Sequence, residues 1–214
     1  LNLNFNDFEQ ISLVACGTAF YACHVAKYWF EEIARIPVEI DIASEFRYRE
    51  PPMTENGAAI FISQSGETID TLAALRYAKS QNQKLLSIVN VQESAIARES
   101  DVVFQTQAGP EIGVASTKAF TTQLTVLSCI CLALAIARNK ISEKRSIELV
   151  DALIEIPARA SEILNHGNKF AKIARPIAEV RDAMYLGRGT NYPIAMEGAL
   201  KLKEISYIHA EGYA

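Results

Sequence analysis

Apolar runs alternate with segments of helical periodicity along much of the chain. Runs typical of buried strands cover residues 11–15, 38–42, 58–62, 84–89 and 101–106. Between these runs, apolar residues recur every three or four positions, as they do on one face of a helix. Strands that alternate with helices predict an α/β fold, in which a parallel sheet carries helices on both faces. Ligands of such sheets bind beyond the carboxyl ends of the strands.

The pattern changes near residue 142. Residues 142–181 have helical periodicity, which we expect Pro157 and Pro176 to interrupt, and they are interpreted as a helical connector. A new strand is predicted over residues 182–186. The sequence thus predicts a first domain over residues 1–141, the connector, and a further α/β segment over residues 182–214.

The last segment repeats the beginning of the chain. An apolar strand, Gly17-Thr18 and a helix bearing Tyr21 correspond to an apolar strand, Gly189-Thr190 and a helix that opens at Tyr192. We interpret this as the start of a second copy of the same unit. One strand and one helix cannot bury a core alone, so we expect the chain to be part of a longer protein.

Composition narrows the class of protein. The 214 residues are half hydrophobic and carry a formal charge of −4, which argues against a nucleic-acid binder with a concentrated basic face. The four cysteines and three histidines lack the spacing of zinc ligands, which favours a reduced, cytoplasmic protein without a metal. No signal peptide is recognised, and the longest apolar stretch, residues 126–137, is shorter than the roughly 20 residues that cross a bilayer.

The first candidate site is the loop 63–68, which separates a strand from a helix. The unpaired N–H groups and the dipole of a helix start favour an anion. Ser63, Ser65 and Thr68 can donate to phosphate oxygens, and Gly66 permits close backbone approach. The loop contains no Lys or Arg, which favours a terminal sugar phosphate over a triphosphate. Ser and Thr are equally typical of a helix N-cap, so the loop alone supports both interpretations.

The second candidate site lies on the last predicted helix. Glu197, Lys201 and Glu204 are spaced i, i+4 and i+7, which places them on one face. Two carboxylates beside an ammonium group could transfer protons and stabilise an enolate. The simpler alternative is an exposed helix face with a Glu–Lys pair.

Three further patterns are weaker indications of a functional site, and each has a simpler explanation. The Gly187-Arg188-Gly189 turn is half of a dinucleotide fingerprint and lacks the third glycine. Cys16 follows a strand as a nucleophile could, although a small residue in a tight turn accounts for it. Arg47 and Arg49 could contact a phosphate, but we favour domain or subunit contacts.

Several motifs carry a resemblance when they are taken together. They are the loop 63–68, Ser-Gln-Ser-Gly-Glu-Thr, the turn Cys16-Gly17-Thr18, and the segments 44–49, 111–121 and 197–211. The loop 63–68 is similar to the signature of sugar isomerase (SIS) domains. The whole set, in its order along the chain, resembles the isomerase half of the bacterial glucosamine-6-phosphate synthase (glutamine:fructose-6-phosphate aminotransferase) family.

The resemblance implies a doubly wound parallel sheet flanked by helices, followed by the connector and the first strand and helix of a second SIS domain. It also implies an N-terminal glutaminase domain, a homodimer and a role in amino-sugar synthesis. The family converts fructose 6-phosphate and glutamine-derived ammonia to glucosamine 6-phosphate without a metal or nucleotide cofactor. A fragment that ends at Ala214 would bind sugar phosphate weakly and would not turn over.

Site roles also follow from the resemblance. It implies that the sugar phosphate is bound by Ser63, Gln64, Ser65 and Thr68, and that the sugar is lined by Cys16, Gly17, Thr18, Val114, Ala115 and Ser116. Glu204 would be the base that moves a proton between C1 and C2, while Lys201 and Glu197 would support the open-chain sugar.

One residue departs from the family pattern, and two other functions are considered. Ala19 stands where the family commonly has Ser, which removes one hydroxyl near the substrate. A stand-alone isomerase with a single SIS domain would not need the repeat that begins at Asp182. A sugar-phosphate-sensing SIS module of a transcription regulator should carry a basic helix-turn-helix segment, and none precedes Ile11.

Overall fold

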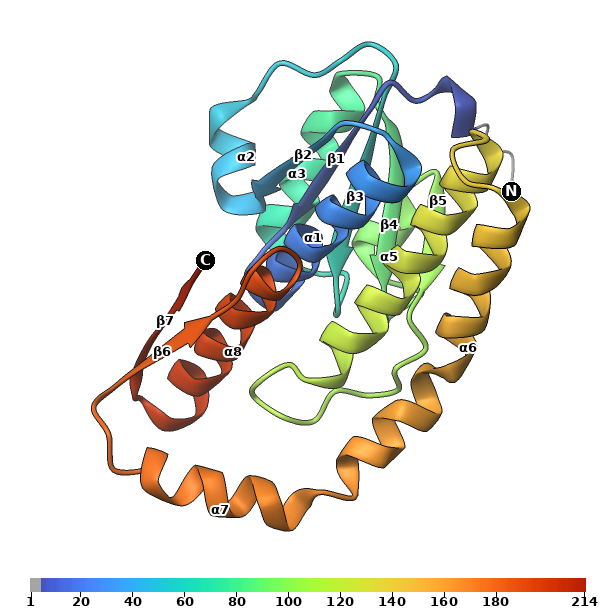
Figure 1. The fold of residues 1–214 in the computed structure, drawn as a ribbon. Helices are drawn as coiled ribbons and strands as arrows, with labels where there is room; N and C mark the ends of the chain where they lie inside the picture. Colours follow the sequence, from blue (N-terminus) through green and yellow to red (C-terminus); the bar gives the residue numbers. More distant parts are fainter. Residues whose placement is uncertain (1–4) are drawn as a thin grey trace. The chain divides into compact units, whose positions relative to one another are not determined.

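The computed structural model describes residues 5–214, which divide into two compact units after Lys140. Strands and helices alternate in the first unit (Figure 1): η1 (Phe5–Asp7), β1 (Gln10–Ala15), α1 (Gly17–Trp29), the π-helical turn η2 (Phe30–Ala34), β2 (Val38–Ile42), α2 (Ala43–Arg49), β3 (Gly57–Ser63), α3 (Ile69–Ser80), β4 (Lys84–Val89), α4 (Ala95–Glu99), β5 (Val102–Gln105) and α5 (Lys118–Ala137). Every strand predicted from the apolar runs of this unit is present.

The strands of the first unit form one parallel sheet in the order β2-β1-β3-β4-β5. Ala15, at the end of β1, is opposite both Ile42 of β2 and Ile62 of β3. The chain therefore adds a strand on one side of β1 and then continues on the other side. This order creates a switch point between the carboxyl ends of β1 and β3, where ligands of doubly wound sheets bind.

Helices cover both faces of this sheet, so the predicted doubly wound α/β fold is confirmed. Figure 1 shows α1 and α5 side by side on one face, with α2 and α3 on the other. Side chains alternate between the faces along each strand. Val14, Phe61 and Leu85 belong to one core cluster with Phe46 of α2 and Leu75 of α3. By the alternation along the strands, their sequence neighbours face the other side of the sheet.

The helix α5 contains the longest apolar stretch of the chain, residues 126–137. It is 20 residues long and, by length and composition alone, apolar enough to cross a membrane. Its burial indicates a different role. Leu127, Ile130 and Leu134 are buried, and α5 packs against α1 and η2 as a core helix does.

The second unit contains two long helices and a small βαβ unit: α6 (Glu143–Leu164), α7 (Gly167–Ile177), β6 (Asp182–Leu186), α8 (Asn191–Ser206) and β7 (His209–Tyr213). The predicted interruptions at the prolines are wrong. Pro157 lies inside the 22-residue α6, whose remaining turns outweigh the lost N–H donor and the ring clash of one proline. Pro176 lies one residue from the end of α7. The break lies instead at Asn165 and His166, directly before Gly167.

The strand β7 was not predicted. It pairs in parallel with β6, from His209 opposite Asp182 to Tyr213 opposite Leu186, and α8 packs on both strands. Its sequence lacks an apolar run and contains Gly212. A Cβ at that position would lie 2.7 Å from the backbone of Met196, so the close packing of α8 excludes a side chain there.

Candidate functional site

Two predicted site segments flank the switch point of the first sheet. Cys16, Gly17 and Thr18 follow β1, and the loop 63–68 follows β3. Because Ala15 is opposite Ile62 on the neighbouring strand, the two turns begin side by side. Cys16 and Thr18 are half-buried, and Gly17, with φ 56°, begins α1. The structure therefore brings together the Cys16–Thr18 turn and the predicted phosphate loop.

Hydrogen bonds within the loop 63–68 hold its hydroxyl groups in place. The buried Ser63 Oγ accepts a hydrogen bond from the Gly66 N–H at 3.0 Å and lies 2.9 Å from Thr68 Oγ1. Ser65 Oγ accepts from the Glu67 N–H at 3.2 Å. Each hydroxyl retains donor or acceptor capacity for a ligand, since a hydroxyl offers one donor and two acceptor sites. The loop is thus a preformed polar turn at the start of α3.

The N-cap interpretation of this loop is not supported by the side chains. Thr68 is the N-cap residue of α3 and has extended backbone angles, but its side chain makes no capping hydrogen bond. Its hydroxyl is directed to Ser63 instead. The first N–H groups of α3 therefore lack the usual hydroxyl cap, and such groups favour an anion.

The segment after β4 forms hydrogen bonds to the backbone of the loop 63–68. The Asn90 N–H donates to the Gln64 carbonyl at 3.0 Å, and the Ile96 N–H donates to the Gly66 carbonyl at 3.0 Å. The Glu67 carboxylate accepts from the Ala95 N–H at 2.8 Å, at the start of α4. This negative side chain is therefore directed to α4. Sequence reasoning missed these contacts because most of them use backbone atoms, which leave no residue pattern.

The third predicted segment, Val114, Ala115 and Ser116, lies in irregular chain between β5 and α5. This chain follows a parallel strand, so it leaves the sheet at the same end as the other two turns. Val114 is fully exposed, while Ala115 and Ser116 are half-buried. The expected sugar-lining role of the three residues stays a prediction.

The two arginines of α2 make ion pairs inside the first unit. Arg47 contacts Asp70 of α3 at 2.8 Å and lies 4.9 Å from the ring centre of Tyr48. Hydrogen bonding to Asp70 raises the pKa of Arg47. Arg49 pairs with Asp41 of β2. Both guanidinium groups therefore connect elements of the first unit, and the expected domain or subunit contacts stay a prediction.

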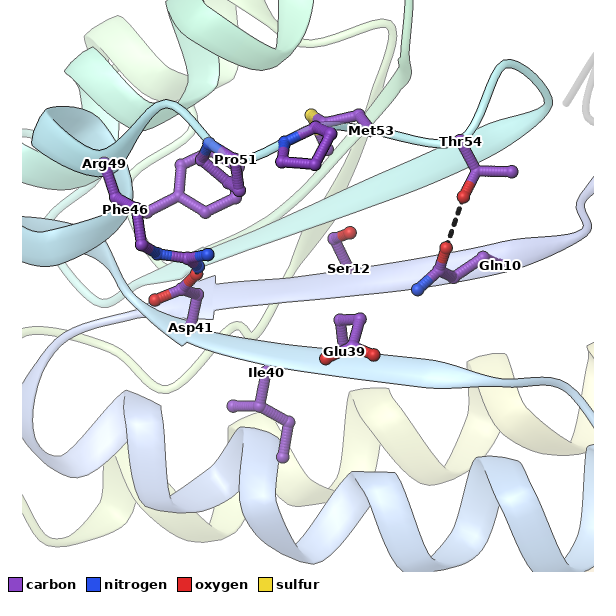
Figure 2. Close-up of a pocket in the computed structure, with 11 residues that line it drawn as sticks. Gln10, Ser12, Glu39, Ile40, Asp41, Phe46, Arg49, Pro51, Met53 and Thr54 are labelled. Atoms are coloured by element: carbon purple, nitrogen blue, oxygen red, sulfur yellow. Dashed lines mark hydrogen bonds and ion pairs between the residues drawn. The ribbon is translucent and has the colours of Figure 1, made fainter.

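A pocket of about 250 Å³ lies against β1 and β2 and contains none of the predicted site residues. Figure 2 shows its polar side chains, and several of them pair with one another: Thr54 with Gln10, and Arg49 with Asp41. Phe46, Pro51 and Met53 form its apolar wall (Figure 2). The sequence offered no motif for this pocket, because its lining comes from three separate segments.

The second candidate site lies on α8 of the second unit. Lys201 Nζ is 2.5 Å from Glu204 Oε2 and 3.6 Å from Glu197 Oε1, so the expected alignment on one helix face is present. The alternative of a fully exposed face is wrong for Glu197, which is only 5% exposed. Two carboxylates that share one ammonium group can hold and move a proton. Their assignment as catalytic residues stays a prediction.

No group of three or more His, Cys, Asp or Glu side chains within residues 5–214 is arranged to hold a metal ion. The four cysteines are free thiols. Burial raises the pKa of Cys131 to about 12, and it raises the pKa of the fully buried Cys23 even further above the ordinary range. Both thiols are therefore protonated and belong to the core.

Comparison with known proteins identifies the fold. A family model described as SIS domain matches residues 5–133 and 169–214. The chain is 57% identical over its whole length to glutamine–fructose-6-phosphate aminotransferase [isomerizing] of Brucella abortus, and 59% identical to that of Bradyrhizobium diazoefficiens. It spans 35% of the length of each of these relatives.

Solved structures agree with these relatives. The C-terminal domain of glucosamine-fructose-6-phosphate aminotransferase from Francisella tularensis superposes with a TM-score of 0.96 at 46% identity. The match covers 98% of this chain and 59% of that one. Tagatose-6-phosphate ketose/aldose isomerase from Escherichia coli, at 19% identity and a TM-score of 0.75 over 98% of this chain and 58% of its own, shares the fold. The chain therefore belongs to the SIS domain family.

Proposed function

We propose that this chain is the sugar-phosphate-binding isomerase part of a glutamine–fructose-6-phosphate aminotransferase. The observation that carries the proposal is the hydroxyl-rich loop 63–68 at the switch point, where Ser63 and Thr68 meet at the uncapped start of α3. Identity of 57–59% over the whole chain to relatives of that name supports it. None of the relatives named above that is comparably identical to the chain is a stand-alone isomerase or a sugar-phosphate-sensing regulator.

In this proposal the first unit holds the substrate. The hydroxyls of Ser63, Ser65 and Thr68 donate to the phosphate oxygens of fructose 6-phosphate, and the hydrogen bond between Ser63 and Thr68 gives way to the ligand because each hydroxyl has one donor hydrogen. The N–H groups at the start of α3 add to the attraction. Gln64 contributes its amide. The turn at Cys16, Gly17 and Thr18 and the segment 114–116 then contact the sugar. Phosphate contacts of this kind fix the position of the reacting carbon atoms without taking part in the chemistry.

The proposed chemistry belongs to α8. Ammonia adds to the C2 carbonyl of fructose 6-phosphate with loss of water, and a proton then moves from C1 to C2 to give glucosamine 6-phosphate. Glu204 is the proposed base for that transfer. Lys201, held between Glu204 and Glu197, stabilises negative charge that develops on the open-chain sugar.

The complete protein would also contain a glutaminase domain that supplies the ammonia. We propose that it is a cytoplasmic homodimer and that it uses no metal or nucleotide cofactor. These features rest on the family alone.

The phosphate assignment is tested by Ser63→Ala and Thr68→Ala in the full-length protein. Loss of a hydrogen bond to a charged group costs about 1.5–3 kcal/mol, so the KM for fructose 6-phosphate should rise by about 10-fold or more. Ser80→Ala is the matched control, because Ser80 lies at the opposite end of α3, where its hydroxyl donates to the Tyr77 carbonyl and accepts from Gln81 Nε2. An unchanged KM in both loop variants would reject the assignment.

The base is tested by Glu204→Gln in the full-length protein. The amide keeps the size of the side chain but cannot accept the proton, so formation of glucosamine 6-phosphate should fall by at least about 100-fold while fructose 6-phosphate still binds. Glu162→Gln, at an exposed position of α6, is the control. Retained turnover in E204Q would exclude Glu204 as the base.

A further inference from the structure

Asn90 is the first residue after β4, and β4 lies between β3 and β5 in the sheet. It therefore stands between the loop 63–68, which follows β3, and the chain that follows β5. Its N–H donates to the Gln64 carbonyl at 3.0 Å. This hydrogen bond joins Asn90 to the proposed phosphate loop through backbone atoms alone.

The side chain of Asn90 faces the other neighbour. Its Oδ1 accepts hydrogen bonds from Thr106 Oγ1 at 3.0 Å and from the Ala108 N–H at 2.9 Å. Its Nδ2 donates to the Gly109 carbonyl at 2.7 Å. The Asn90 carbonyl accepts from Gln105 Nε2 at 3.3 Å. Every polar atom of Asn90 is thus used, and the side chain bonds only to the chain after β5.

The backbone that the Asn90 side chain contacts has unusual conformations. Gln107 has φ 52° and Gly109 has φ 67°, so the backbone reverses through left-handed conformations directly after β5. Such conformations persist when surrounding contacts over-determine them. The three hydrogen bonds of the Asn90 side-chain amide, one donated and two accepted, supply contacts of this kind. From this turn the chain continues through residues 110–113 to Val114, Ala115 and Ser116.

We propose that Asn90 is a positioning residue that fixes the sugar-binding segment 114–116 relative to the phosphate-binding loop 63–68, and so makes the site selective for a hexose phosphate over phosphate alone. The inference rests on the proposed function of both segments. Asn90 uses its backbone for the first segment and its side chain for the second. Removal of the side chain therefore releases the sugar segment and leaves the phosphate loop in place.

The experiment compares two ligands in the full-length protein. The KM for fructose 6-phosphate and the competitive inhibition constant of inorganic phosphate are measured for the wild type, Asn90→Ala and Ser63→Ala. Asn90→Ala should raise the KM by about 10-fold, as expected when several hydrogen bonds of a loop are lost, and should change the phosphate constant less than about 2-fold. Ser63→Ala should weaken both ligands. Asn56→Ala is the control, because Asn56 precedes β3 at the opposite end of the sheet and bonds to the exposed Glu9.

A parallel loss of both ligands in Asn90→Ala, or no change in either, would overturn the positioning role. If Ser63→Ala behaves as expected in that case, the proposed function stands and only the inference fails. If neither ligand binds to the wild type, the proposed function fails and the inference with it. Asn90→Asp gives a second measurement should Asn90→Ala not fold. It retains the acceptor for Thr106 and Ala108 but loses the donor to Gly109, so it should also affect fructose 6-phosphate more than phosphate.

Discussion

Replacement of Gly66 by alanine tests how tightly the phosphate loop is packed. Gly66 has φ 67°, a conformation that an L-residue adopts only at a cost of about 1–2 kcal/mol. A Cβ at this position would also lie 2.0 Å from Ser94 Oγ and 2.4 Å from Ser94 Cβ. Ser94 is only 1% exposed, so it has no free space into which to move.

The two terms add because they arise from different atoms. Forcing an extra methyl group into a packed site costs about 1–3 kcal/mol, and the backbone term brings the expected loss for Gly66→Ala to about 2–5 kcal/mol. Ser94→Gly removes Oγ and Cβ, the two atoms that a Cβ at position 66 would clash with. In a Ser94→Gly background, Gly66→Ala should therefore cost only the free energy of the left-handed backbone conformation, without the packing cost.

Urea unfolding of the 214-residue chain measures these differences. Trp29 is the only tryptophan and lies in α1, so its fluorescence reports on the unit that contains Gly66. The double-mutant cycle should give a coupling of about 1–3 kcal/mol between positions 66 and 94. A loss below about 1 kcal/mol for Gly66→Ala, or additive effects of the two substitutions, would refute the packing argument.

Two further predictions concern titratable groups in the first unit. Burial and the nearby Lys27 charge lower the pKa of His24 in the folded protein. The imidazole of the unfolded chain, with its pKa of 6.5, therefore binds protons more readily than the folded one. The free energy of unfolding should fall as the pH drops below about 6.5. Urea titrations between pH 7 and 5 should show a smaller fall for His24→Gln, and an equal fall would contradict the assignment. The exposed Cys129 should react with a thiol reagent at neutral pH, whereas the buried Cys23 and Cys131 should react only at the rate of unfolding. Fast labelling of all three thiols would contradict this expectation.

The sequence predicted the strands of the first unit and the turns at their carboxyl ends, because both depend on local patterns. Apolar runs identify buried parallel strands such as β3, whose seven residues are all buried. The spacing of Glu197, Lys201 and Glu204 was enough to place them on one helix face. The burial of Glu197 was not predicted, because it depends on neighbours that are distant in sequence.

Features built from backbone contacts could not be predicted. The proposed role of Asn90 depends largely on carbonyl and N–H groups of two neighbouring segments, and backbone groups leave no pattern in the sequence. The strand β7 was missed because Gly212 and its polar neighbours do not form an apolar run. The continuation of α6 through Pro157 shows that a local rule can be outweighed by the rest of a long helix.

The position of β1 between β2 and β3 has a consequence for synthesis on the ribosome. β1 is the first strand to emerge, β2 then adds to one of its edges, and β3, β4 and β5 add in turn on the other side. Each new strand meets an edge that is already formed, so the sheet can grow outwards as the chain lengthens, and no strand has to be inserted between two others. The switch point is defined by β1, β2 and β3, which are all synthesised by residue 63, before β4 and β5. The strands that define the binding end of the sheet are thus made before the chain that later surrounds it.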